Sequence, residues 1–273
     1  MKLDKIICAL ISVGFISCQS SPGLRSPAAA GKTAVTCQSS KRRNITQYEQ
    51  GQAAGGAIKV AFFDADSTLR VSKSGAVSAN AVDDVRILPN IGRILKHLQQ
   101  NKYLVYIVSN QNGVGAGKIS CEIAEGALLK TVSLIATAGG VVHGYDFAEN
   151  GDEFRKPGTG MAVALEQALK IKYGAQVFID KKNSFMVGDS AFKKAIQNKA
   201  DASGNEEADL RFSLSKLEPG THFSNADRLF AQAVGIYFYE ATDFFGWRKF
   251  GIDVLETSED VDKFLKICTD CTL

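Results

Sequence analysis

The sequence has little excess charge and few residues that bind transition metals. Its 32 basic and 29 acidic residues leave a net charge of +3, too mild to indicate nucleic-acid binding by itself. The histidines number three and the cysteines six. Cys268 and Cys271 form a C-x-x-C pair without a second ligand pair, so no zinc site is expected there. The chain has no internal repeat, and its 273 residues suit one domain or two small ones.

An apolar run near the N-terminus is too short to cross a bilayer comfortably. Ile6 to Ser17 follows a lysine-bearing start and ends at Cys18, which is typical of a secretory signal and resembles a bacterial lipobox. We therefore predict a lipoprotein-type signal peptide at residues 1–18, with a lipid on Cys18 that holds the protein in the membrane of the cell envelope. The alternatives are an uncleaved anchor, or ordinary signal cleavage that gives a periplasmic or secreted protein.

The next segment is rich in small and polar residues and lacks the period of a helix or a strand. Residues 19–57 are predicted to form a flexible tether. Residues 58–267 form the predicted domain, and residues 268–273 a C-terminal tail. Gly31-Lys32-Thr33 lacks the upstream glycine spacing and the strand of a phosphate-binding loop, so none is predicted.

Strands and helices alternate from residue 58 onward. Apolar runs predict strands at 58–63, 103–108, 141–142, 185–187 and 236–239, and helical periodicity predicts helices at 91–100, 120–138, 159–173 and 227–234. This alternation predicts an α/β fold with a parallel sheet covered on both faces. Asp64, Ser109 and Asp189 directly follow strands, and ligands bind outside the carboxyl ends of such strands. We therefore expect these three side chains to meet in one site.

Two carboxylates lie two residues apart after the first strand. Asp64 suits a nucleophile that forms an aspartyl phosphate, and Asp66 suits the acid that protonates the leaving oxygen and later activates water. Ser109 can donate to a phosphoryl oxygen, and Lys156 can offset charge in the transition state. Such oxygen-rich sites suit Mg²⁺, for which Asp189 offers a further ligand. By itself, a D-x-D pair is more often a helix cap or part of a calcium loop.

The motifs taken together resemble the haloacid dehalogenase superfamily of phosphatases. In chain order they are Asp64-Ala65-Asp66-Ser67-Thr68, Ser109, Lys156 and Gly188-Asp189. The resemblance implies a Rossmann-like parallel sheet with Asp64 as the nucleophile and Asp66 as the acid/base. It also implies a magnesium ion held by Asp64, the Asp66 carbonyl and Asp189. The gaps between the first three motifs are short, which implies a capless domain with an open site.

The superfamily usually places a second acid shortly after the G-D motif, where this chain has Lys193 and Lys194. Asp227 is a candidate to replace that acid as a metal ligand, from after a polar insertion at about 196–221. The alternative is an acid stabilised by the dipole at a helix N-terminus. The sequence leaves both interpretations of Asp227 open.

A closer resemblance is to the phosphatase domain of the polynucleotide kinase 3′-phosphatase family. It rests on four segments, residues 109–118 (S-N-Q-N-G-V-G-A-G-K), 154–161 (F-R-K-P-G-T-G-M), 223–231 (F-S-N-A-D-R-L-F-A) and 242–245 (T-D-F-F). It implies removal of a 3′-phosphate from a DNA end or a nucleotide, without a kinase domain. Asn110, Lys118 and Arg155 are the expected substrate-binding residues. Ala116 stands where the family commonly has arginine, and Ser67 where it usually has glycine.

Two other functions stay open. One is a small-molecule phosphatase of the sugar or histidinol type in the cell envelope, although only Cys121 and His143 lie where that branch often has a zinc loop. The other is a non-catalytic, surface-binding lipoprotein on the same fold, against which the intact motif residues argue. Export conflicts with cytoplasmic DNA repair, so the two predictions together imply trimming of DNA or nucleotides outside the cytoplasm. No protein partner is predicted.

Overall fold

The computed structural model describes most of the predicted domain and a short segment before it. The described residues are 37–38, 42–46, 48, 56–189 and 224–247. The predicted signal with Cys18, the insertion at about 196–221 and the tail at 268–273 lie outside them. Among the described residues, no helix combines the length and the apolar character that crossing a membrane requires.

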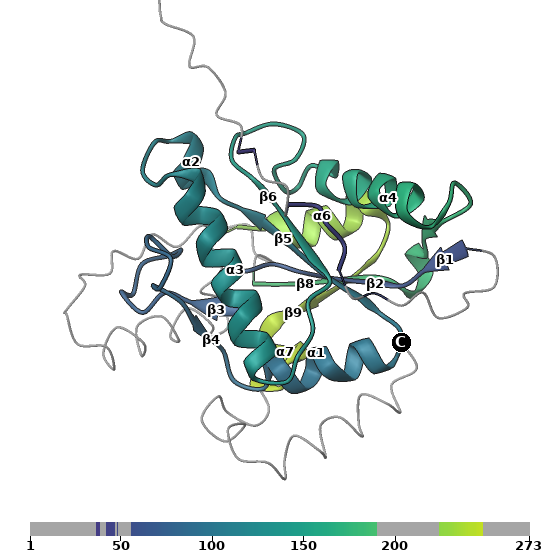
Figure 1. Ribbon diagram of the computed structural model, residues 1–273, viewed down its shortest axis with the longest axis horizontal. Helices are drawn as coiled ribbons and strands as arrows, with labels where there is room; N and C mark the ends of the chain where they lie inside the picture. The colour runs from purple at the N-terminus through teal and green to yellow at the C-terminus, as the bar shows by residue number, and fades with distance from the viewer. Residues whose placement is uncertain (1–36, 39–41, 47, 49–55, 190–223, 248–273) are drawn as a thin grey trace, which may run out of the picture. The chain divides into compact units, whose positions relative to one another are not determined.

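A parallel sheet of five strands forms the core of the domain (Figure 1). In spatial order the strands are β6 (Gly144–Ala148), β5 (Leu104–Asn110), β2 (Val60–Phe63), β8 (Phe185–Gly188) and β9 (Tyr237–Glu240). The register sets Phe63 beside Ile107 on one side and Val187 on the other. Because all neighbours are parallel, the carboxyl ends of β5, β2 and β8 lie together at one edge of the sheet.

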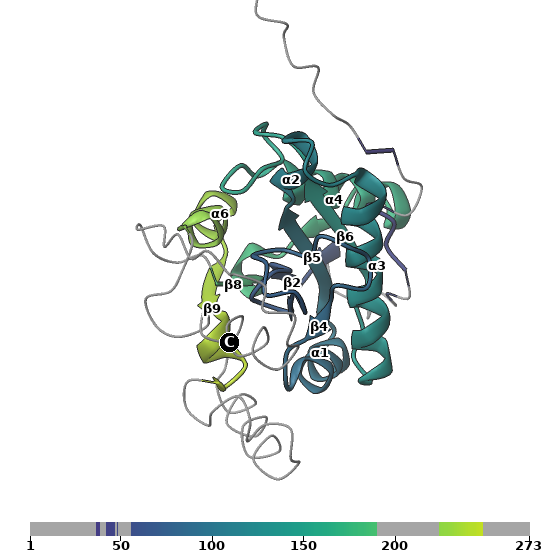
Figure 2. The same cartoon turned by 90° about the vertical axis from the view of Figure 1, so that its left-hand side faces the viewer.

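Helices cover both faces of the sheet. Ala61 and Phe63 of β2 pack in the same apolar cluster as α1 (Ile91–Gln100) and α3 (Cys121–Thr137). The alternate residues Val60 and Phe62 pack with α4 (Gly160–Tyr173) and α6 (Ala226–Val234). Figure 1 shows the two pairs of helices on opposite sides of the strands, and Figure 2 shows α6 and α1 separated from each other by the strands. The predicted α/β fold with a parallel sheet covered on both faces is therefore confirmed.

Several short elements are not predicted by the sequence, because segments of two to four residues carry no period. They are the parallel pair β1 (Ala57–Ile58) and β7 (Phe178–Ile179), the antiparallel pair β3 (Arg70–Val71) and β4 (Arg86–Ile87), α2 (Asn112–Gly115), a 3₁₀ turn (Lys181–Asn183) and α7 (Ala241–Phe244). The strand predicted at 141–142 is wrong. The strand in this region is β6, whose first residue Gly144 and buried Asp146 obscure its apolar pattern.

Neither gap between the first three motifs holds a further domain. Both stretches are fully described. The first, from Asp64 to Ser109, contains β3, β4 and α1, and the second, from Ser109 to Lys156, contains α2, α3 and β6. Within these two described stretches the domain therefore has no cap, so neither stretch places an inserted domain over the carboxyl edge of the sheet.

Part of the segment predicted as a tether packs against strand β6. Cys37 forms a disulfide with Cys121, the first residue of α3, and the sequence reasoning assigned neither cysteine a partner. The Thr46 amide donates to the His143 carbonyl at 2.7 Å, and the Arg43 amide donates to the Tyr145 carbonyl at 3.1 Å. The prediction of a flexible tether is therefore wrong for Cys37 and residues 42–46, which belong to the folded domain.

Two arginines of this segment neutralise an acid buried in the sheet. Asp146 is fully buried in β6, and its two carboxylate oxygens accept from Arg42 Nε and Arg43 Nε, each at 2.6 Å. Arg42 also pairs with Glu149 after the same strand. Burying a carboxylate without such partners costs free energy of folding, so this segment stabilises the buried carboxylates of Asp146 and Glu149.

Candidate active site

A cavity of about 340 Å³ lies at the carboxyl ends of β2, β5 and β8. Its lining includes residues from all four predicted motifs together with one from α6, namely Asp64, Asp66, Ser109, Lys156, Asp189 and Asp227. The amide of Asp64 donates to the Val187 carbonyl at 3.0 Å, which continues the β2–β8 pairing up to the first of these residues. The structure therefore brings Asp64, Ser109 and Asp189 together, as the topology of the predicted sheet requires.

The Lys156 ammonium joins two carboxylates inside this cavity. Its Nζ lies 2.6 Å from Asp64 Oδ1 and 2.7 Å from Asp227 Oδ1, and it donates to the Val108 carbonyl at 2.8 Å. Burial alone would lower the pKa of Lys156, but the attraction of Asp227 and Asp64 outweighs it and raises that pKa above its ordinary value. Lys156 therefore stays charged and holds the two acids in place.

Asn110 fixes the backbone of Lys156. Its Nδ2 donates to the Lys156 carbonyl at 3.0 Å, and its Oδ1 accepts from the Lys156 amide at 2.9 Å. Both polar groups of the side chain are used in this clamp, which joins residues 46 positions apart. Asn110 lines the cavity, but its contacts position Lys156, and the substrate contact predicted for it stays a prediction.

Asp64, Asp189 and Asp227 form a group of buried carboxylates with ligand atoms within 4.8 Å of one another. Asp227 comes this close because Gly188 has no side chain, since a Cβ there would lie 2.3 Å from Asp227 Oδ2. Burial raises the pKa of Asp64 to about 7, with Lys156 opposing the shift and Asp227 adding to it. Three acids around one ammonium leave excess negative charge, which a hard divalent cation with oxygen ligands would fit. Of the two interpretations of Asp227, this geometry favours the metal ligand.

The Asp66 side chain has different partners. Its Oδ1 accepts from Arg70 Nε at 2.9 Å, and its Oδ2 accepts from Gln111 Nε2 at 2.9 Å. The same Gln111 nitrogen donates to Ser109 Oγ at 2.8 Å. The Asp66 side chain is not part of the acidic group, and the metal contact predicted for its carbonyl stays a prediction. Neither Arg70 nor Gln111 is predicted as a site residue from the sequence, although Gln111 lies in a segment that resembles the polynucleotide family.

The rim of the cavity combines a cation with a small apolar surface. Arg155 lines the cavity, as do Val77 and Ser78 from the loop between β3 and β4. Val77 is 46% exposed, so it offers apolar surface to the solvent as well as to the cavity. Lys118 is exposed and is not part of the lining. A substrate contact from Lys118 therefore requires a ligand that extends beyond the cavity.

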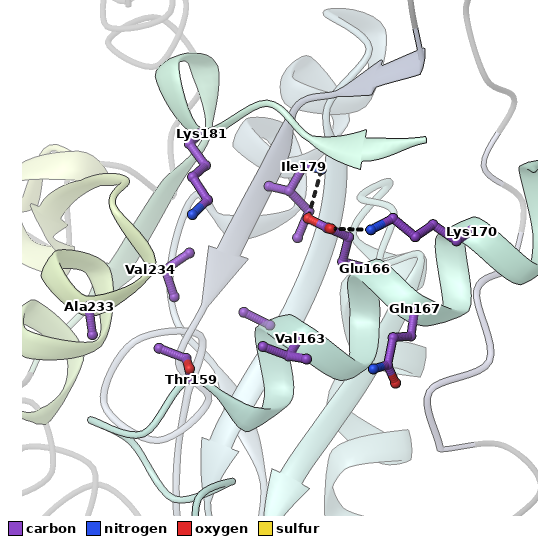
Figure 3. A pocket seen from close by; sticks show the side chains of 10 residues that line it. Thr159, Val163, Glu166, Gln167, Lys170, Ile179, Lys181, Ala233 and Val234 are labelled. Carbon is purple, nitrogen blue, oxygen red and sulfur yellow. Dashed lines mark hydrogen bonds and ion pairs between the residues drawn. The ribbon is translucent and has the colours of Figure 1, made fainter. Parts of the chain in front are cut away.

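A second cavity, of about 300 Å³, lies between α4, β7 and the C-terminal end of α6 (Figure 3). Glu166 accepts from Lys170 at 2.6 Å and from the Ile179 amide at 3.2 Å within it. None of the residues predicted for the active site lines this cavity. The acid in its lining, Glu166, is paired with Lys170, and among the described residues the lining has no second acid beside it.

Comparison with known proteins gives a family and several relatives. The family model described as polynucleotide kinase 3 phosphatase matches residues 59–245. An uncharacterized 20.8 kDa protein of Autographa californica nuclear polyhedrosis virus is 32% identical over 186 residues, covering 68% of this chain and 85% of the viral protein. A D-glycero-beta-D-manno-heptose-1,7-bisphosphate 7-phosphatase of Haemophilus ducreyi is 28% identical over 48% of this chain and 72% of its own length. An Acanthamoeba polyphaga mimivirus protein, named for polynucleotide phosphatase and kinase activities, is 26% identical over 69% of this chain and 42% of its own length.

Replacing Asp227 tests the acidic group directly. Asp227→Asn removes one of three clustered charges, so we expect Mg²⁺ to bind at least about ten-fold more weakly. Isothermal titration calorimetry on the folded protein measures this without reference to turnover. The matched control is Asp83→Asn, because the Asp83 side chain is 80% exposed. Unchanged Mg²⁺ affinity in Asp227→Asn would instead favour an acid that only stabilises the start of α6.

Proposed function

The chain belongs to the polynucleotide kinase 3 phosphatase family, within the haloacid dehalogenase-type phosphatases, and we propose that it removes 3′-phosphate groups from DNA ends or nucleotides. The observation that carries the proposed chemistry is the buried Lys156 ammonium, 2.6 Å from Asp64 and 2.7 Å from Asp227. It fixes a carboxylate at the floor of a cavity that Asp66 also lines. A nucleophile and an acid/base in one cavity can divide phosphate hydrolysis into two steps.

In the first proposed step Asp64 is the nucleophile. One of its oxygens attacks phosphorus, the bond from phosphorus to the leaving 3′-oxygen breaks, and protonated Asp66 gives its proton to that oxygen. Lys156 orients Asp64 and offsets the negative charge of the phosphoryl oxygens. Ser109 Oγ accepts from Gln111, which leaves its own hydroxyl proton for donation to a phosphoryl oxygen.

In the second proposed step water attacks the aspartyl phosphate. Asp66, now a carboxylate, takes a proton from the water while the bond between Asp64 and phosphorus breaks. Inorganic phosphate leaves, and both acids return to their starting states. A magnesium ion held by Asp64, Asp189, Asp227 and the Asp66 carbonyl would supply the charge neutralisation that an anionic nucleophile needs near a phosphate dianion.

The proposed preference for a polynucleotide end has two supports. The family is described by a 3-phosphatase activity, and the site has no cap in the described gaps between motifs. Arg155 lines the cavity, and Lys118 lies exposed on the turn after α2. Such cations contact phosphates and position a strand without reading its sequence. A sugar phosphate is the second candidate substrate, because the Haemophilus ducreyi relative is named as a heptose bisphosphate phosphatase.

We further propose that the protein is anchored at the cell envelope by a lipid on Cys18. The support is the signal-like start of the sequence together with the disulfide between Cys37 and Cys121. Disulfides persist in oxidising compartments and are rare in the cytosol of most organisms. An exported enzyme of this kind would act on DNA fragments or nucleotides outside the cytoplasm.

The substrate proposal is tested by specificity constants. We expect a higher kcat/KM for a 3′-phosphorylated oligonucleotide than for its 5′-phosphorylated isomer or for sugar phosphates. Ala116→Arg restores the residue that the family commonly has, so it should raise kcat/KM for the oligonucleotide and steepen its fall with salt. Ala116→Gln is the uncharged control. The polynucleotide proposal fails if kcat/KM is higher for sugar phosphates, or if Ala116→Arg and Ala116→Gln have the same kcat/KM for the oligonucleotide and the same salt dependence. The proposed phosphatase activity would stand in either case.

The compartment is tested by mass spectrometry of the native protein. We expect an acylated Cys18 at the N-terminus and, without reduction, a linked peptide pair that contains Cys37 and Cys121. A linked pair with an unacylated N-terminus beyond the signal would indicate ordinary cleavage. An intact Met1 with both thiols free would contradict export and favour DNA repair in the cytoplasm.

A further inference from the structure

Arg70 is a fully buried arginine that contacts the second carboxylate of the cavity. Its side chain is 1% exposed, and its Nε donates to Asp66 Oδ1 at 2.9 Å while Nη2 donates to Oδ2 at 3.4 Å. A guanidinium out of water needs hydrogen-bond acceptors, and both oxygens of the Asp66 carboxyl accept from it. The Asp66 side chain is 16% exposed and lines the cavity. Arg70 therefore contacts the proposed acid/base from within the protein, because Arg70 itself does not line the cavity.

The turn after β2 places these two side chains against each other. The amides of Leu69 and Arg70 both donate to the Ala65 carbonyl, and the Ser67 amide donates to the Arg70 carbonyl at 2.7 Å. Ser67 takes a positive φ of 61°, where the family usually has the glycine that this left-handed region favours. The pair thus meets across a tight loop whose backbone is itself fixed by hydrogen bonds.

A second anchor holds Arg70 from helix α3. Its Nη1 donates to Thr131 Oγ1 at 3.0 Å, and the Thr131 hydroxyl donates to the Ala127 carbonyl at 2.8 Å. On the opposite side, Gln111 donates to Asp66 Oδ2 at 2.9 Å. Each carboxylate oxygen of Asp66 therefore accepts a hydrogen bond from a side chain that is itself held in place. The charged donor, Arg70, is hydrogen-bonded to Thr131 of helix α3.

We propose that Arg70 is the positioning residue that fixes the Asp66 carboxyl for proton transfer to the leaving oxygen. This inference rests on the proposed function, in which Asp66 is the acid/base. A proton donor must lie within hydrogen-bond reach of the oxygen it serves, and an unrestrained Asp side chain samples several rotamers. The side-on fork of Arg70 selects one orientation of the carboxyl plane. A lysine carries the charge but not the fork, so it would hold that plane less well.

The test compares leaving groups. The constant kcat/KM reports steps up to departure of the leaving group, so slow hydrolysis of the aspartyl phosphate does not affect it. Arg70→Met should lower kcat/KM for the alkyl phosphate that the wild type hydrolyses best at least about ten-fold more than for p-nitrophenyl phosphate, whose leaving group needs no proton. Arg70→Lys should recover part of this difference. Asp66→Asn should likewise lower kcat/KM more for the alkyl phosphate than for p-nitrophenyl phosphate. Adding Arg70→Met to Asp66→Asn should leave the ratio of these two constants, the selectivity, unchanged.

A purely structural role for Arg70 predicts a different pattern. Loss of folded enzyme would lower both constants by the same factor, which would overturn the inference. The inference would also be overturned if Arg70→Met changed the ratio of the two kcat/KM values as much in the Asp66→Asn background as in the wild type.

Arg86→Met on β4, in the same strand pair, is the matched control and should leave that ratio as in the wild type. Circular dichroism checks folding. If Arg70→Met does not fold, Arg70→Lys and Thr131→Val carry the same comparison. Absence of hydrolysis of either substrate by the wild type would overturn the proposed function instead.

Discussion

The buried ammonium of Lys156 holds together a site that three separate parts of the chain build. It bonds to Asp64 after β2 and to Asp227 on α6, while Asn110 after β5 clamps its backbone. Without that charge the two buried carboxylates would lose the ammonium that offsets their repulsion, and removing one partner of a buried ion pair is strongly unfavourable. Asp227 can lie this close to β8 because Gly188 has no side chain, since a Cβ there would lie 2.3 Å from Asp227 Oδ2. The geometry of the cavity therefore depends on one ion pair network.

A second charge network fixes the outer part of the sheet. Asp146 is buried in β6 and is neutralised by Arg42 and Arg43, which come from a segment about a hundred residues earlier. The disulfide of Cys37 with Cys121 holds the same segment to the start of α3. Because α3 also carries Thr131, which anchors Arg70, the segment before the sheet supports a helix that reaches the proposed acid/base.

The sheet and the convergence of its strand ends could be predicted from the sequence, because each strand is a local apolar run and one topological rule brings Asp64 and Asp189 together. Helix α1 has the predicted bounds, since it has a clear apolar face. What could not be predicted depends on partners far apart in sequence. Asp146 interrupts the apolar pattern of β6, and its ion pairs with Arg42 and Arg43 explain how it can be buried there. Arg70 could not be predicted because a charged residue outside the predicted strands and helices is expected to be exposed, whereas it is buried in β3.

The central claim is that a covalent bond forms between phosphorus and Asp64 during turnover. The direct measurement is a denaturing acid quench during turnover of a phosphate-radiolabelled substrate, followed by peptide mapping. The account predicts label on the peptide that contains Asp64, sensitive to hydroxylamine as an acyl phosphate is, and none in Asp64→Asn. Turnover by folded Asp64→Asn, or active wild-type enzyme that never carries label at this residue under single-turnover conditions, would contradict it.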